Sequence, residues 1–207
     1  MIKSELQRRK LDANREKNEA TFGNATTLAA YNLYHAYIDY AKSQIDPTKD
    51  GLILDMHGQS HSEQWTEFGY VLPKWRITSD TYSSSARPSV CALIQRNCNS
   101  LSNSTCFRDL IRGNVSLGDR LNVAGYNSIP SDEFPLGGDS VYGYYTGGHV
   151  VKEHGSKACT SGLNVDAIQV EMPSSIRLFN ETHADYVEKL ADAVKGFMDD
   201  FYPGWLV

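Results

Sequence analysis

Two patterns of apolar residues recur along the chain, and one of them, a short unbroken run, is typical of buried β-strands. Short aliphatic runs bounded by turn residues occur at Gly51–Met56 and at Val165–Met172. A third run, Phe68–Leu72, ends at Pro73, which cannot continue a central strand. The pattern therefore predicts three strands along the chain.

The other pattern is the helical spacing of apolar residues that is typical of amphipathic helices. It predicts a long helix that begins at Thr26 or Thr27 and ends near Ile45, because Pro47 keeps the residue before it out of the helical region. We expect one face of this helix to lie in the core. That apolar face consists of Leu28, Tyr31, Tyr34, Ile38, Ala41 and Ile45.

The remaining segments predict shorter elements and loops. A closing helix is expected over Thr182–Phe201, and Asn127–Ser140 is expected to be an exposed loop suited to the rim of a site. Three short helices are predicted between the strands, at Val90–Arg96, Phe107–Arg112 and Leu117–Val123. Strands that alternate with helices indicate an α/β domain, so we expect a mixed, mostly parallel sheet flanked by helices.

Length and composition set the broad class of protein. The 207 residues suit a single domain with a sizeable core. The net charge of -5 at pH 7 argues against a nucleic-acid partner. No apolar run approaches the length of a bilayer-spanning helix, so no membrane partner is expected. The sequence carries no signal of the oligomeric state.

Cysteines and glycosylation acceptors favour an extracellular, oxidising setting. No CxxC pair is present, which argues against a zinc knuckle and for disulfides, although the sequence does not choose among three pairings. The four cysteines are Cys91, Cys98, Cys106 and Cys159. The four Asn-x-Ser/Thr acceptors are Asn24, Asn103, Asn114 and Asn180. We therefore expect a secreted, glycosylated and disulfide-bonded protein.

Candidate chemistry lies at the ends of the first and last strands. His57 follows the first strand at its carboxyl end, where α/β proteins place ligands, and Asp55 points to the same side. Glu171 shares a strand face with Gln169 among apolar neighbours, where an acid is costly unless it is paired or functional. His61 follows within the same polar loop. Taken singly, each histidine has a simpler interpretation as a locally hydrogen-bonded loop residue.

Four segments in order resemble a known family. They are LDANRE at Leu11–Glu16, ILDMHG at Ile53–Gly58, TGGHVVKEHG at Thr146–Gly155 and IQVEMPSSIR at Ile168–Arg177. Their order and spacing resemble the N-formylglutamate amidohydrolase-like branch of the zinc carboxypeptidase fold. The resemblance covers nearly the whole chain and implies metal-assisted hydrolysis of an amide near a free carboxylate.

The resemblance also implies roles for individual residues. His57 would bind one zinc ion, and Glu171 would be the general base that deprotonates the attacking water. Asn14 and Arg15 would hold a substrate carboxylate, belonging to a small amide or to a peptide C-terminus. His154 stands where carboxypeptidases place a substrate-facing tyrosine, and a histidine there can still donate a hydrogen bond. His61 would contact the substrate or support the site.

One part of the family pattern is absent. A catalytic zinc needs three protein ligands, and no His-x-x-Glu pair occurs in this sequence. We therefore expect residues 1–207 to be the C-terminal part of a larger hydrolase-type domain, with an exposed sheet edge and no activity by itself. Two alternatives stay open: a local site in which His61 joins His57, and a non-catalytic secreted binding or structural protein that uses the same fold.

Overall fold

The computed structural model describes residues 1–79, 87–98, 103–134, 136, 143–156, 165–178 and 180–205. These residues form a four-stranded mixed sheet in the order β1-β4-β2-β3. β1 pairs with β4 in parallel, β2 pairs with β3 in parallel, and β2 pairs with β4 antiparallel. The predicted mixed, mostly parallel sheet is confirmed. The strands are β1 Gly51–Gly58, β2 Thr66–Gly69, β3 Ser128–Ile129 and β4 Val165–Met172.

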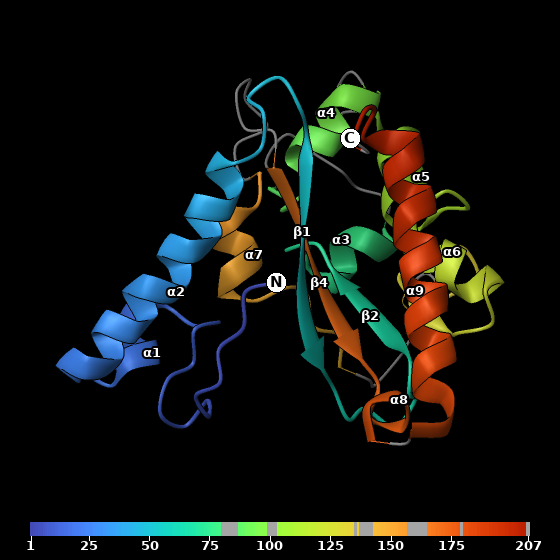
Figure 1. The fold of residues 1–207 in the computed structure, drawn as a ribbon. Helices are drawn as coiled ribbons and strands as arrows, with labels where there is room; N and C mark the ends of the chain where they lie inside the picture. The colour runs from blue at the N-terminus through green and yellow to red at the C-terminus, as the bar shows by residue number, and fades with distance from the viewer. Residues whose placement is uncertain are drawn as a thin grey trace.

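Helices cover both faces of this sheet. Figure 1 shows α2 and α7 on one face and α9, with α5 and α6, on the other. The helices are α1 Lys17–Thr21, α2 Ala25–Ser43, α3 Lys74–Thr78, α4 Cys91–Cys98, α5 Ser104–Arg112, α6 Leu117–Val123, α7 His149–His154, α8 Ser174–Leu178 and α9 Asn180–Phe201.

Local side-chain and backbone geometry explains where two elements begin and end. The cap of α2 is Asn24 rather than a threonine, because its side chain accepts hydrogen bonds from the amides of Thr26 and Thr27. β2 lies earlier than predicted and stops at Gly69. Val71 has a φ of 60°, which takes the chain out of the extended conformation before Leu72.

The predicted exposed loop at Asn127–Ser140 is partly wrong. Ser128 and Ile129 form β3, and the stretch from Ser128 to Ser131 is buried. β3 pairs with β2, and the Ser128 hydroxyl donates a hydrogen bond to the Gly118 carbonyl. A two-residue strand of this kind depends on pairing with neighbouring strands, so the polar composition of the segment does not predict it.

The two faces of β4 have different environments. Ile168 and Val170 are fully buried in the main hydrophobic core, which α9 covers through Tyr186. Gln169 and Glu171 alternate with them and therefore point to the opposite face, toward α7. The sheet thus separates an apolar core on one side from a polar cluster on the other.

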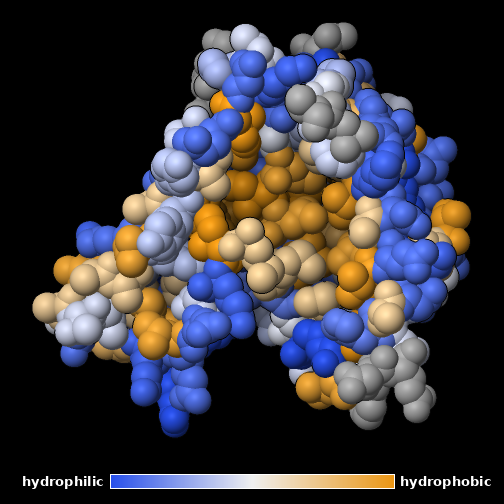
Figure 2. Space-filling model, viewed as in Figure 1, coloured by the Kyte–Doolittle hydropathy of each residue, from blue (hydrophilic) through white to orange (hydrophobic). Residues whose placement is uncertain are grey.

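β1 forms one edge of the sheet and is only partly covered. Among the described residues it pairs with β4 alone. Figure 2 shows an apolar hollow that extends over β1 between α2 and α9. The predicted core face of α2 is correspondingly incomplete, because Tyr31 and Ile38 are buried whereas Ala41 is exposed.

The structure supports part of the extracellular interpretation. Cys98 and Cys106 form a disulfide, which is compatible with an oxidising compartment, and Cys159 lies outside the described residues. Asn24, Asn103 and Asn114 are exposed. In the part of the chain that the structure describes, no helix combines the length and hydrophobicity that a bilayer span requires.

Candidate functional site

The carboxyl ends of β1 and β4 bring the main candidate residues together. The two strands are parallel and in register, so that His57 pairs with Glu171 and Asp55 pairs with Gln169. All four residues therefore share the sheet face that is turned toward α7. A pocket of about 410 Å³ opens at this point and is lined by Asn14, Arg15, His57 and Glu171, among others. Four of the six predicted site residues thus meet in one place.

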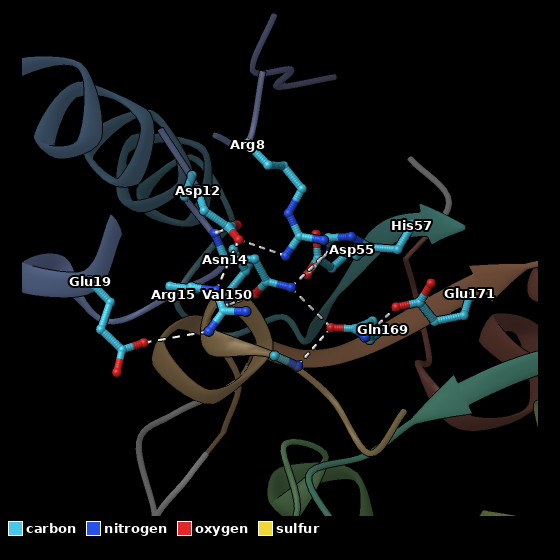
Figure 3. Close-up of polar contacts among 12 residues, drawn as sticks. Arg8, Asp12, Asn14, Arg15, Glu19, Asp55, His57, Val150, Gln169 and Glu171 are labelled. Atoms are coloured by element: carbon cyan, nitrogen blue, oxygen red, sulfur yellow. Dashed lines mark hydrogen bonds and ion pairs between the residues drawn. The ribbon is translucent and has the colours of Figure 1, made fainter. Parts of the chain in front are cut away.

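Asn14 joins three parts of the chain at the centre of this site (Figure 3). Its Oδ1 accepts a hydrogen bond of 2.8 Å from the amide of Val150, in the first turn of α7. Its Nδ2 donates to Gln169 Oε1 over 3.2 Å and lies 3.2 Å from His57 Nε2. Both ends of the Asn14 amide are therefore engaged by the protein, so this side chain acts mainly by holding its neighbours in place.

Gln169 completes this network, and the sequence interpretation did not include it in the site. Its Oε1 accepts from the Gly148 amide over 2.6 Å and from Asn14, which forces its Nε2 toward Glu171. Nε2 donates to Glu171 Oε1 over 2.8 Å. The available signal was the spacing in IQVE, because residues two apart on a strand share a face.

Charge around His57 decides its protonation. Its Nε2 lies 2.9 Å from Asp55 Oδ2, although that buried oxygen has no well-aligned hydrogen bond among the described residues. Burial favours the neutral imidazole, but the carboxylates of Asp55 and then Glu171 outweigh it, so the pKa of His57 is raised. A proton on Nε2 favours the contact with Asp55, and its loss favours the contact with Asn14.

Glu171 is a buried carboxyl that lines the pocket. Burial raises its pKa, and the charges of Glu67 and Asp55 act in the same direction, whereas His57 opposes them. A carboxylate with a raised pKa is a better proton acceptor than a fully exposed one. Glu171 therefore has the electrostatic environment expected of a general base.

The cationic side of the pocket contains more groups than predicted. Arg15 lines the pocket, but its Nε lies 3.1 Å from Asp12 Oδ2 and its Nη1 lies 3.6 Å from Glu19. Arg8 also contacts Asp12, over 2.8 Å, and lines the same pocket. Lys152 is a third cation in the lining, and no ion pair joins it to a described residue. It is the cation most available to an anionic ligand.

His61 lies behind the pocket wall. Its Nδ1 is 2.6 Å from the buried Glu67, and its ring stacks on Tyr145, with ring centroids 5.0 Å apart. Glu67 also accepts from the Tyr145 amide over 2.9 Å, and Tyr145 lines the pocket. Residues 57–61 do not form a helix, so the spacing that would place His57 and His61 on one helical face is absent. His61 supports the wall through Tyr145.

His154 is not among the residues that line the pocket. It is the last residue of α7 and is buried against α2. Its Nε2 lies 2.7 Å from His35 Nδ1, and its Nδ1 lies 3.1 Å from Asp39 Oδ1. The expected substrate-facing position is therefore occupied by a residue that turns away, because α7 presents its final side chain to α2.

The described residues do not complete a metal site. Within the described ranges, no group of three or more His, Cys, Asp or Glu side chains is arranged to hold a metal ion. His57 supplies one imidazole, whereas His61 contacts Glu67 and His154 contacts His35. A catalytic zinc needs three protein ligands, so the residues present do not fit a complete zinc site.

Comparisons with known proteins add no further assignment. No family model matches the chain, no curated protein is significantly similar to it, and no solved structure is significantly similar to its fold. Functional interpretation therefore depends on the geometry of the site and on the motifs in the sequence.

Proposed function

We propose that this chain carries the general base and the carboxylate-binding pocket of an amide hydrolase. Its substrates are small carboxylate-bearing amides or peptide C-termini, as the resemblance to the N-formylglutamate amidohydrolase-like branch of the zinc carboxypeptidase fold implies. The observation that carries the proposal is the register of His57 with Glu171 in a pocket that also contains Arg15. The proposed setting is extracellular.

The chemistry follows from the side chains in that pocket. Glu171 accepts a proton from a water molecule, whose oxygen then forms a bond to the amide carbon. The protonated Glu171 returns this proton to the nitrogen as the carbon–nitrogen bond breaks, giving a carboxylic acid and an amine. The Gln169 amide keeps one oxygen of Glu171 in a fixed direction, and a protonated His57 offsets negative charge that develops on the carbonyl oxygen.

Zinc enters this proposal only as an expectation. The resemblance assigns one zinc ion to the family and makes His57 a ligand. Because the described residues do not form a three-ligand group, no catalytic step is assigned to the metal here. When bound, zinc would polarise the amide carbonyl and lower the pKa of its water.

Recognition of the carboxylate falls to the cationic wall. Arg15 presents a planar guanidinium that suits a carboxylate, but Asp12 and Glu19 already neutralise part of its charge. Lys152 adds a positive charge, and no ion pair joins it to an acid among the described residues. The two side chains together offset one ligand carboxylate.

A binding protein without catalysis is the second candidate function. The absence of a three-ligand metal group among the described residues favours it, because the pocket and its cations do not depend on a metal. The same pocket would then retain a carboxylate ligand without cleaving it.

A paired binding and hydrolysis assay separates the two functions. The 207-residue chain is dialysed against metal-free buffer, and its zinc content is measured. Binding and cleavage of N-acetyl- and N-formylglutamate are then followed with and without added zinc. Binding with cleavage supports the hydrolase, and binding without cleavage supports the binding protein. A chain that neither binds nor cleaves these amides would overturn both.

A further inference from the structure

A second, apolar cavity adjoins the polar pocket. It has a volume of about 540 Å³ and lies between α2, β1 and the N-terminal residues 1–13. Arg8, Asn14 and His57 line both spaces, so these three residues form a shared wall. The two spaces therefore meet at the point where Glu171 and His57 are in register.

The lining of this cavity combines the predicted core face of α2 with residues 52–57 of β1 and with the N-terminal segment. Ile38 and Ala41 line it from α2, Ile45 lines it just after that helix, and Ile53 lines it from the face of β1 that also carries Asp55 and His57. The apolar spacing of α2 predicted that this face would be covered by protein, and here it borders an open space instead. Figure 2 shows the hollow in this region.

Polar groups are concentrated where the cavity meets the pocket. Asp55, His57 and Asn14 stand there, whereas most of the lining farther along α2 and β1 is aliphatic. Apolar walls with a few convergent polar groups are typical of small-molecule sites, and this volume lies within the range of such sites. Water in the aliphatic part has few hydrogen-bonding partners, so displacing it with an apolar group is favourable.

These contacts specify an amphiphilic ligand. We propose that the two spaces form one bipartite site for N-acyl amino acids, with an apolar acyl chain in the α2–β1 cavity. The amino-acid carboxylate then lies in the polar pocket near Lys152 and Arg15, which complement its charge. The amide crosses the shared wall beside His57 and Glu171. This inference rests on the proposed function and narrows its substrate class.

A chain-length series tests the cavity without requiring catalysis. N-acylglutamates with acyl chains from acetyl to dodecanoyl are titrated into the metal-free 207-residue protein by calorimetry. Affinity is expected to rise about fourfold for each added methylene until the cavity is full. The matching N-acylethanolamines lack the carboxylate and are expected to bind more weakly at every chain length. Affinity that is independent of chain length would overturn the proposal.

A variant pair localises the effect to the α2 face. Ala41→Trp places an indole in the cavity, so decanoylglutamate is expected to bind roughly tenfold more weakly, with a much smaller loss for acetylglutamate, whose short chain does not fill the cavity. Ala36→Trp makes the same change on an exposed position of α2 outside both spaces and is the control. Equal affinities of both variants for decanoylglutamate would exclude this cavity. If Ala41→Trp does not fold, the chain-length series decides alone.

Failure of this inference is distinguishable from failure of the proposed hydrolase. Chain-length-dependent binding without cleavage would keep the bipartite site and remove the catalytic role. Cleavage of acetylglutamate with no gain from longer chains would keep the hydrolase and remove the acyl cavity. A second copy of the chain is the competing occupant of the cavity, and sedimentation of the same samples detects it as a dimer. Dimers that exclude the long-chain ligands would overturn the proposal.

Discussion

Two histidine groups lie on the same side of the sheet, and their surroundings shift the imidazole pKa in opposite directions. His57 sits at the pocket with Asp55 and Glu171, whereas His35 and His154 join α2 to α7 beside Asp39. Each group combines imidazole with carboxylate, yet the pKa of His57 is raised and those of His35 and His154 are lowered. The presence of a nearby acid therefore does not by itself decide the charge of a histidine.

The difference comes from what each ring faces. Two carboxylates, on Asp55 and Glu171, act on His57 and outweigh its burial. For His35, burial is the largest influence, and the charge of His149 lowers the pKa further against Asp39 and Glu153. For His154, burial together with the charges of His35 and Lys42 lowers the pKa and outweighs Asp39, whose side chain is 66% exposed. Facing imidazoles thus favour neutrality, and buried carboxylates favour charge.

Counting protons in the second group shows how much charge it accepts. His35 Nε2 donates to the Ala13 carbonyl, His154 Nδ1 faces Asp39, and one proton lies between the two rings. These three contacts require three N–H groups, which is one proton more than two neutral imidazoles carry. A second extra proton would turn both facing nitrogens, 2.7 Å apart, into donors. The pair therefore accepts one charge and resists another.

Removing a carboxylate from the first group should have the largest effect. Glu171→Gln abolishes the proton acceptor, so the proposed hydrolysis should fall by about 10²- to 10⁴-fold. The same change removes one of the two acids that raise the pKa of His57, so this ring should become more like His35. Steady-state kinetics and NMR titration of the imidazole measure the two effects. Glu188→Gln, on the exposed face of α9, is the control.

Unchanged turnover in Glu171→Gln would remove Glu171 as the base. The wild-type rate should also fall at acidic pH, because protonated Glu171 cannot accept a proton and burial raises its pKa. In Glu171→Gln any residual rate should lose this acidic decline.

Gln169→Leu should produce the next largest effect, on stability. The Gln169 side chain is buried, and the substitution leaves the Gly148 amide without its hydrogen-bond acceptor and Glu171 without its hydrogen-bond donor. Loss of such partners costs about 1–3 kcal/mol. Urea unfolding of this variant measures the change, with exposed Gln95→Leu on α4 as the matched control. Equal midpoints for the two variants would show that this network does not stabilise the fold.

Acidification tests the second histidine group, whose pKa values are shifted in the direction opposite to that of His57. The lowered pKa values of His35 and His154 mean that the unfolded chain binds protons more readily below pH of about 6.5. The stabilising contribution is therefore complete above that pH and is lost as pH falls. Because the pair accepts one proton and resists a second, the loss should not exceed about 1.4 kcal/mol per pH unit.

His35→Asn should flatten this acidic loss of stability, since it removes one of the two facing rings. His183→Asn, at an exposed position of α9, should leave it unchanged. Thermal unfolding between pH 5 and pH 8, buffered at each step, provides the comparison. The proton count would be wrong if His35→Asn kept the full pH dependence of the wild type.

The sequence predicted the regular part of the fold because local pattern controls it. The aliphatic runs located β4 at Val165–Met172 and the start of β1 at Gly51, and helical spacing located most of α2 and α9. β3 and α7 were missed, because a two-residue strand and a six-residue helix depend on partners far along the chain. The finer comparison with the zinc carboxypeptidase fold stays a prediction.

In the candidate site, too, some residues were predicted from local sequence and others were missed. His57 and Glu171 were predicted because each stands near the carboxyl end of a recognisable strand. Gln169 and Lys152 were missed because their places depend on long-range packing against the Gly148 turn and α7. The orientation of His154 away from the pocket and toward α2 depends on His35 and Asp39, more than a hundred residues earlier.

Lys152 offers the smallest and most selective change, because it touches neither histidine group. Lys152→Gln removes an exposed charge from the pocket rim, so binding of N-acetylglutamate should weaken by up to about fivefold, within the range of exposed ion pairs. The loss should shrink at high salt, since exposed charges are screened. Calorimetry at two salt concentrations measures both. Lys195→Gln, on α9 away from the pocket, gives the protein the same net charge as Lys152→Gln and should bind N-acetylglutamate like the wild type. If the two variants weakened binding equally, the long-range charge of the protein, rather than a contact at Lys152, would attract the carboxylate.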